Sequence, residues 1–248
     1  MPRTLKLLLS ISLLAGSLLS ARAQSGVRPA PAAPQQQVEV KLQTSADADA
    51  LKAEQLCEQG RAHAARGGAS EARATFASAV RLYLRIYMKE RPGGSDAAAY
   101  SAFRAQTRER LKGAPRCVED YLALVRATPF EREQLEAFAG QVSMLVEADA
   151  ARSLLSRPEV DARAVITSKP HPGFTEEARR NNVRGRVRLR AVLGLDGVVR
   201  HVFVLEGLPF GMSEECVAAA KRIRFTPAVK NGRPVSQIVV LEYNFDTH

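Results

Sequence analysis

Residues 186–207 read RVRLRAVLGLDGVVRHVFVLEG, and their pattern predicts a β-hairpin. Arginine alternates with aliphatic residues in the first half, as in a strand with one polar and one apolar face. Asp196-Gly197 favours a two-residue turn, and a second β-branched run follows it. The arginine face raises the question of function, because it would suit a polyanion-binding surface, a merely solvated face or part of a known module.

The turn at Asp196-Gly197 also predicts the register of the two strands. It places Leu189 opposite Val204 and Arg190 opposite Phe203, with Val192 opposite His201. One face is then mainly aliphatic. On the other face the arginine stems lie over apolar neighbours while their charged ends stay in water. We therefore expect one buried face and one solvated face.

The elements around the hairpin predict an α+β domain over residues 165–248. Thr175 is placed to cap a short helix, and Ser213 is placed to cap a second helix after the hairpin. Residues 236–245 predict a last strand. The order helix, strand, strand, helix, strand predicts a three-stranded antiparallel sheet with two helices on one face.

Five motifs in fixed order make this region resemble the C-terminal domain of the TonB family. Two positions depart from the family pattern, because Phe174 stands where tyrosine is usual and Ile223 where tryptophan is frequent. The motifs are PGFTEEA at 172–178, GRVRL at 185–189, DGV at 196–198, RFTPA at 224–228 and NGRPV at 231–235.

The resemblance implies recognition by strand addition in the periplasm. It implies that the last strand binds an extended segment of an outer-membrane transporter, or of another cell-envelope protein, and contributes to energy-coupled transport. The alternative is that this strand is only a structural edge, and a homodimer through the C-terminal domain is also left open. No cofactor or metal is implied. The expected partner-binding residues are Ser236, Gln237, Ile238, Val239, Val240 and Leu241.

The N-terminal residues predict export. Residues 1–23 contain basic residues, then an apolar run shorter than a bilayer span, then Ala21-Arg22-Ala23, which fits a signal-peptidase site. An uncleaved inner-membrane anchor facing the periplasm is the alternative. Residues 24–44 are rich in proline and glutamine at their start and predict an extended linker. We therefore expect a periplasmic protein.

Residues 45–158 predict an all-α domain, so the chain is multidomain. The clearest helix spans about 70–90, where aromatic and aliphatic residues recur at helical spacing. Thr128, Pro129 and Glu131 form a capping-box pattern that starts a later helix. The residues expected to face the core in the first of these helices are Phe76, Val80, Tyr83 and Tyr87.

The first helix pair weakly resembles a tetratricopeptide repeat. Small residues at Gly60 and Ala72 would let two antiparallel helices pack closely. His63 and Leu84 stand where that motif has tyrosine and proline, so any array would be irregular. The matching positions are Leu56, Gly60, Ala72, Phe76 and Ala79.

This domain organisation differs from that of a TonB transducer. Proteins of that family have a membrane-spanning N-terminal helix that engages an inner-membrane motor complex, and a long proline-rich spacer. Here a cleavable signal, a short linker and a helical domain stand in their place. The difference favours a periplasmic adaptor, whose helices hold one partner and whose C-terminal domain holds another, over direct energy transduction.

Charge and cysteine content narrow the partners. The formal charge is +10, and removal of residues 1–23 takes away three basic residues and no acidic one. An exported protein rarely meets nucleic acid, so no nucleic-acid partner is expected. In an oxidising compartment a Cys57–Cys117 bridge is one option. The other is that these two cysteines and Cys216 are small buried apolar residues.

No catalytic pattern stands out in the sequence, and we do not expect an enzyme. The histidines His63, His171, His201 and His248 are scattered without metal-ligand spacing. Nucleophile elbows, Cys-x-x-Cys pairs and phosphate-binding glycine loops are absent. Two other functions stay open beside strand addition: a scaffold that acts through the helical domain, and a polyanion-binding surface.

Overall fold

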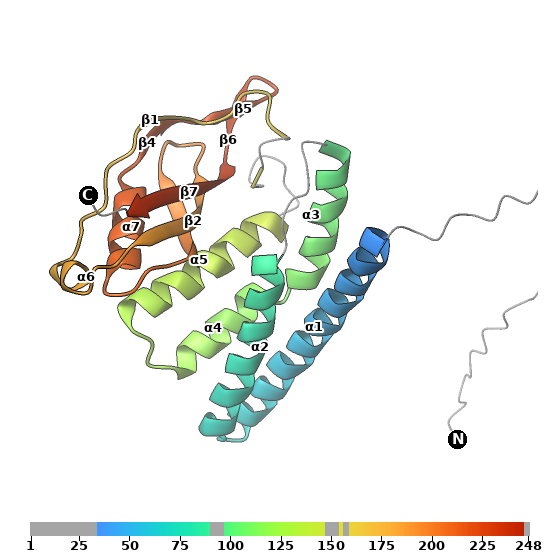
Figure 1. The fold of residues 1–248 in the computed structure, drawn as a ribbon. Coiled ribbons are helices and arrows are strands. Elements are labelled where there is room, and N and C mark those ends of the chain that lie inside the picture. The colour runs from blue at the N-terminus through green and yellow to red at the C-terminus, as the bar shows by residue number, and fades with distance from the viewer. Residues whose placement is uncertain (1–33, 90–96, 147–153, 156–158, 246–248) are drawn as a thin grey trace, which may run out of the picture.

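The protein consists of a helical domain followed by an α+β domain (Figure 1). A computed structural model describes residues 34–89, 97–146, 154–155 and 159–245. The predicted signal at 1–23 lies outside the described residues, and so do residues 156–158, where the predicted helical domain ends. Within the described part of the chain, no helix is long and apolar enough to cross a membrane.

Five helices make up the described N-terminal part, which confirms the predicted helical domain. The first begins inside the segment that we expected to be linker, so residues 34–44 are helical. Proline is compatible with the first helical position, and the glutamine, glutamate and lysine that follow favour a helix. The helices are α1 (Pro34–Ala65), α2 (Ala69–Lys89), α3 (Ala97–Leu111), α4 (Ala114–Leu124) and α5 (Pro129–Val146).

Helices α1 and α2 form a closely packed pair. A Cβ atom at Gly60 would lie only 2.9 Å from the ring of Phe76, so glycine is needed where α1 crosses that side chain. Ala72 is fully buried on the facing helix. The predicted stripe of α2 is buried as expected, from Phe76 to Tyr87. Small residues and an aromatic stripe therefore explain the pair without a repeat array.

The capping box at the start of α5 is confirmed. The Thr128 amide donates to Glu131 Oε2 over 2.9 Å, and the Glu131 amide donates to Thr128 Oγ1 over 3.2 Å. Hydrogen bonding from the backbone and side chain of Thr128 lowers the pKa of the Glu131 carboxyl. The cap fixes where α5 starts, and α5 packs against strand β3 of the other domain.

A disulfide joins Cys57 of α1 to Cys117 of α4, with their Cα atoms 5.8 Å apart. The predicted option of a bridge is therefore confirmed for these two residues. Cys216 is free and buried in the other domain. The bridge ties the two ends of a 60-residue stretch of the helical domain together.

The α+β domain is built on a three-stranded antiparallel sheet in the order β3-β2-β7, as predicted. Helix α7 packs on one face, where Cys216 and Val217 meet Leu189 and Leu241. Two small two-stranded sheets, β1-β4 and β5-β6, complete it. The elements are β1 (Val165–Ser168), α6 (Glu176–Arg180), β2 (Gly185–Leu193), β3 (Val199–Glu206), α7 (Met212–Lys221), β4 (Arg224–Thr226), β5 (Ala228–Lys230), β6 (Arg233–Val235) and β7 (Gln237–Phe245).

The predicted two-residue turn of the β2-β3 hairpin is wrong. Gly197 has a φ of 80° and donates to the Gly194 carbonyl, while the Gly194 amide donates to the Val198 carbonyl. This makes a three-residue loop with glycine in the left-handed position. As a result Leu193 pairs with Val199. The Asp196 carboxylate holds the loop through Arg200, which lowers the pKa of Asp196 to about 2.

A bulge at His201 restores the predicted register at Arg190 and Leu189, before it shifts again at Arg188. His201 has a φ of 49°, and the register shifts between Arg190 and Val192. Arg190 then pairs with Phe203, as expected, while Val192 pairs with Arg200 and not with His201. The extra residue in the loop and the extra residue in the bulge therefore compensate each other.

Helix α7 is not capped by Ser213 as predicted. Its N-cap is Gly211, with a φ of 77°, and the Ser213 hydroxyl instead bonds the amide and carbonyl of Leu208. A left-handed residue at this place favours glycine. The prediction for the short helix α6 is confirmed, because Thr175 Oγ1 accepts a hydrogen bond from the Ala178 amide.

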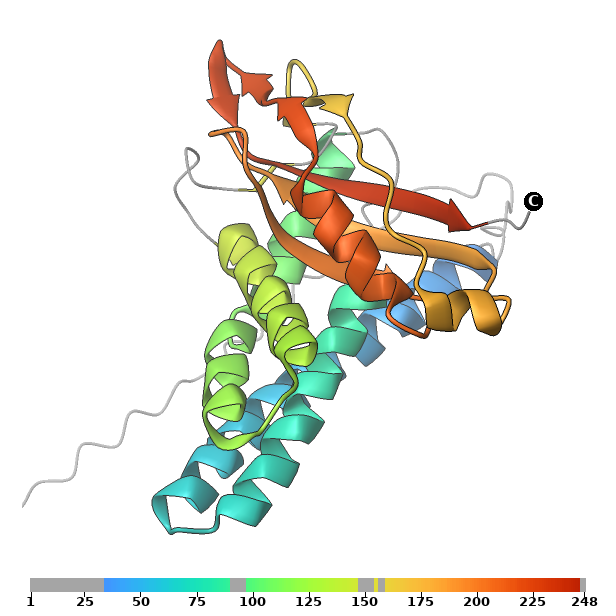
Figure 2. The same cartoon turned by 90° about the vertical axis from the view of Figure 1, so that its left-hand side faces the viewer.

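The helical domain covers part of the face that we expected to be solvated. Figure 2 shows α7 on one side of the sheet and the helical domain on the other. The ring of Phe203 lies 5.7 Å from that of Tyr87, and the Arg190 guanidinium lies over the Tyr87 ring at 4.4 Å. Val192 is also buried against the helices. The apolar residues on this face need a cover, and the hairpin sequence alone does not show what supplies it.

Candidate partner-binding edge

The sheet has two outer strands, β3 and β7, and the helical domain closes the first. Gln134 of α5 donates from Nε2 to the Val202 carbonyl over 3.3 Å, and its Oε1 accepts from the Val204 amide over 2.8 Å. Its amide thus bonds the two main-chain groups that flank Phe203 on the side away from β2. A neighbouring strand would use the same groups, so this part of the β3 edge is occupied.

A second glutamine holds the bulge of β3. Gln141 is fully buried, and its Nε2 donates to the carbonyls of Arg190 and His201 over 2.9 and 2.5 Å. Gly140 lets α5 come this close, since a Cβ atom there would overlap the His201 ring. Burial is the main cause of the lowered pKa of His201, and Arg200 adds to it.

The first three residues of the predicted binding strand are already engaged within the chain. The Leu155 amide donates to the Ser236 carbonyl over 3.0 Å, and the Ile238 amide donates to the Leu155 carbonyl over 2.8 Å. These bonds form a parallel bridge between Leu155 and Gln237. The Gln237 side chain is buried, and its Oε1 accepts from the Ala164 amide over 2.8 Å.

The other three predicted residues point to alternate faces of β7. Leu241 is buried and Val239 is partly buried in the core below α7. Val240 pairs with Arg190 across the sheet, and 53% of its surface is exposed. Of the six predicted residues, Val240 is therefore the accessible one.

The open main-chain groups of β7 follow from the alternation of an antiparallel strand. The Ile238 amide bonds Leu155 and the Glu242 carbonyl bonds Lys169, so the even-numbered residues direct their main-chain groups away from β2. Among described residues, nothing bonds the Ile238 carbonyl, either group of Val240 or the Glu242 amide. These four groups form the open segment of β7.

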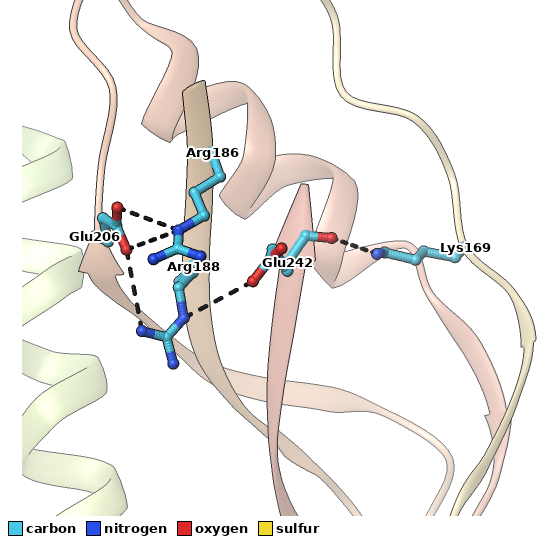
Figure 3. A network of polar contacts seen from close by, with 5 residues as sticks. All are labelled: Lys169, Arg186, Arg188, Glu206 and Glu242. Atoms are coloured by element: carbon cyan, nitrogen blue, oxygen red, sulfur yellow. Dashed lines mark hydrogen bonds and ion pairs between the residues drawn. The ribbon is translucent and has the colours of Figure 1, made fainter. Parts of the chain in front are cut away.

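The arginines near this edge are paired with carboxylates. Arg186 lies 3.2 Å from Glu206, and Arg188 lies 4.0 Å from Glu206 and 3.9 Å from Glu242 (Figure 3). Arg190 is stacked on Tyr87. Because all three guanidinium groups have intramolecular partners, they form a poorer polyanion site than the sequence pattern indicated.

Sequence reasoning missed the residues that close or limit the two edges. Leu155 comes from the segment between the domains, and Lys169 lies ahead of the short helix α6. Gln134 stands among the charged residues of α5, where it looks like an ordinary surface residue. A polar residue next to the core stripe of α5 was the one signal in the sequence, because Gln141 directly precedes Val142.

The helical domain has a separate shallow groove of about 370 Å³ between α4 and α5. Its apolar floor includes Val118 and Leu122, and its rim includes Arg132 and Glu136. The groove lies on elements other than the β7 edge, so it is a second candidate binding surface.

Titratable groups do not gather into a reactive cluster in the described part of the chain. No three histidine, cysteine or acidic side chains there come together to hold a metal ion. Burial raises the pKa of the free Cys216 thiol to about 12, which keeps it protonated and unreactive at neutral pH. The chemistry that the edge offers is main-chain hydrogen bonding.

Comparison with known families agrees with this geometry. Residues 170–247 match the family described as Gram-negative bacterial TonB protein C-terminal. The resemblance seen in the sequence is therefore confirmed, and this region is a TonB C-terminal domain. Domains of this family take part in energy-coupled transport and interact with outer-membrane proteins. No curated protein matches the chain.

Proposed function

We propose that the protein binds an extended segment of an outer-membrane transporter, which adds as a strand to the outer edge of β7, and that it thereby contributes to energy-coupled transport. One observation carries this proposal: the main-chain groups around Val240 face outward without a partner among the described residues. Strand addition uses such groups for affinity and the flanking side chains for selection.

The closed β3 edge supports the choice of β7. Gln134 occupies β3, whereas Val240 is more than half exposed on β7. An unprotected edge strand is prone to pair with other chains, so proteins usually cover it. Because the helical domain covers the β3 edge, the open β7 edge is best explained as a binding site for a partner strand.

We propose the periplasm as the compartment. The predicted export signal at 1–23 and the Cys57–Cys117 disulfide both support it, because disulfides persist in oxidising compartments. Proteins of the TonB family lie in the periplasm or are anchored in the inner membrane facing it. The role of the protein is binding without catalysis, in keeping with the transport-associated family that residues 170–247 match.

A second candidate function is that of a scaffold whose helical domain holds the main partner. The groove between α4 and α5 favours it, since an apolar floor with a charged rim suits a protein partner. In the adaptor version of our proposal, the groove and the β7 edge bind different partners.

Site-specific photo-cross-linking in a Gram-negative cell envelope tests the two candidates against each other. A photoreactive amino acid replaces Val240 in one variant and Ala123, which lines the groove, in another. Strand addition predicts a cross-link from position 240 to an outer-membrane transporter. A cross-link from position 123 alone would contradict strand addition and favour the scaffold.

Peptide binding gives a direct test of pairing. A synthetic peptide copying the extended periplasmic segment of the cross-linked transporter should shift the NMR amide signals of Val240 and Glu242. The same peptide with N-methylated alternate residues lacks the amide hydrogens for pairing and should bind far more weakly. Equal binding of the two peptides would contradict strand addition.

A further inference from the structure

The open segment of β7 has a limit at each end. At one end, Leu155 is hydrogen-bonded to the Ser236 carbonyl and the Ile238 amide. At the other end, Lys169 donates a hydrogen bond to the Glu242 carbonyl. Between these two contacts lie four main-chain groups that are free among the described residues. A partner that leaves the intramolecular contacts in place therefore pairs over a short stretch centred on Val240.

Lys169 is the more easily displaced of the two limits. Its Nζ donates to the Glu242 carbonyl over 2.6 Å and lies 4.4 Å from the centre of the Tyr243 ring. The lysine is exposed, and it approaches β7 from the side opposite to Arg188 (Figure 3). A lysine at a strand edge also hinders unspecific pairing.

The charges around the edge do not balance. Three cations, Lys169, Arg186 and Arg188, face two carboxylates, Glu206 and Glu242. The two arginines pair with the two glutamates, while no described carboxylate forms an ion pair with Lys169. Its ammonium group has a main-chain carbonyl and an aromatic ring as neighbours, so it is the charge that an incoming carboxylate would satisfy.

We propose that Lys169 is a specificity determinant of the open edge, and that it selects an extended segment in which an apolar residue is followed or preceded directly by an acidic one. The inference rests on the proposed strand addition. On binding, a partner amide replaces the ammonium at the Glu242 carbonyl, and the ammonium moves to the partner carboxylate.

The alternation of side chains fixes the spacing of this motif. Val240 points to the face that carries Arg190, whereas Tyr243 belongs to the core below α7, and Lys169 lies over the Tyr243 ring. A partner side chain beside Val240 and one beside Lys169 are therefore on opposite faces of the incoming strand. Residues separated by an odd number of positions meet that condition, and adjacent residues are the shortest case.

The test compares three fluorescent ten-residue peptides that are blocked at both ends. Each has valine at alternate positions; the first has aspartate next to the central valine, the second has asparagine there, and the third has proline in place of the central valine. We expect the wild-type protein to bind the aspartate peptide about two- to fivefold more tightly than the asparagine peptide, as for an exposed ion pair. Added salt should reduce this ratio.

Two variants assign the preference to Lys169. Lys169→Met keeps the side-chain length and removes the charge, so the ratio of the two affinities should fall to about one. Lys230→Met changes a lysine of β5, which is not part of the β7 edge, and should leave the ratio as in the wild type. A ratio that survives in Lys169→Met overturns the inference.

The design separates failure of this inference from failure of the proposed function. If the proline peptide binds as well as the others, or no peptide shifts the Val240 amide signal, strand addition itself fails. If peptides shift that signal but aspartate gives no advantage, only the role of Lys169 fails. A protein dimer that Val240→Pro abolishes would assign the edge to a second copy and would overturn both.

Discussion

The two outer strands of the three-stranded sheet differ in how far their outer main-chain groups are covered. On β3, Gln134 takes the place of a neighbouring strand, and Gln141 and three packed rings seal the adjoining face. On β7, a single residue, Leu155, pairs with the beginning, and the groups around Val240 stay open. Both strands have similar sequences rich in β-branched residues, so composition does not distinguish them.

In the proposed strand addition, the helical domain contributes to recognition by closing the other edge of the sheet. A three-stranded sheet alone offers two edges, and either would pair with an extended chain. Helix α5 removes one of them. An extended partner can then pair with β7 alone. Leu155 already occupies the beginning of β7, so pairing with the partner starts after that contact.

The largest expected effect is the loss of stability when the disulfide of the helical domain, which closes β3, is removed. Reduction of the Cys57–Cys117 disulfide, or Cys57→Ala with Cys117→Ala, should lower the free energy of unfolding by about 4 kcal/mol, because a bridge over 60 residues strongly restricts the unfolded chain. Urea denaturation with and without dithiothreitol measures it. Cys216→Ala is the control: it keeps the disulfide, so reduction should destabilise it as much as the wild type. Unfolding at the same urea concentration in both conditions would contradict the prediction.

A matched pair of prolines compares the two edges directly. Val204→Pro removes an amide that donates to Gln134, whereas Val240→Pro removes an amide without a partner among the described residues. The first should therefore cost about 1–3 kcal/mol more stability than the second. Thermal or urea unfolding of both variants measures the difference, and equal losses would mean that Gln134 does not close β3.

Amide hydrogen exchange compares the two edges with a smaller perturbation than the proline substitutions. Gln134→Ala should speed the exchange of the Val204 amide towards the rate of the Val240 amide, without changing Val240 itself. An unchanged Val204 rate would contradict the closing role of Gln134.

The smallest expected effect is a pH dependence confined to the closed side. The pKa of His201 lies below its usual 6.5, chiefly because of burial. Between the folded pKa and 6.5 the unfolded chain binds the proton more readily, so stability should fall as the pH is lowered through this range. His201→Asn, which tolerates the positive φ, should reduce the fall. Urea unfolding at several pH values checks this, and identical pH profiles for both proteins would argue against it.

The sequence predicted the elements of this protein better than their contacts. Periodicity and caps located the helices, and the alternating strands with ordered family motifs predicted the β3-β2-β7 sheet. The turn went wrong because Asp-Gly serves both two-residue and three-residue loops, and a single extra residue decides between them. Ser213 failed as a cap because Gly211 supplies a left-handed start.

The candidate binding edge was predictable as a strand but not as a surface. Alternation and family resemblance indicated residues 236–241, yet which of them is accessible depends on Leu155, Ala164 and Lys169. These residues are distant in sequence and carry no local signal for β-pairing. The cover on the arginine face was missed for the same reason, since the Tyr87 and Phe203 rings meet only in the folded chain.

The disulfide determines which helices carry the force when tension is applied to the protein. Tension applied between β7 and the N-terminal end of α1 runs back along the chain to Cys117 and crosses the sulfur bridge to Cys57. Helices α2 and α3 lie within the bypassed loop, so they are off the load path and cannot be stretched by that force. The covalent ring therefore keeps α2 and α3 from adding to the extension of the domain, while α5 and the part of α1 before Cys57 still carry the force.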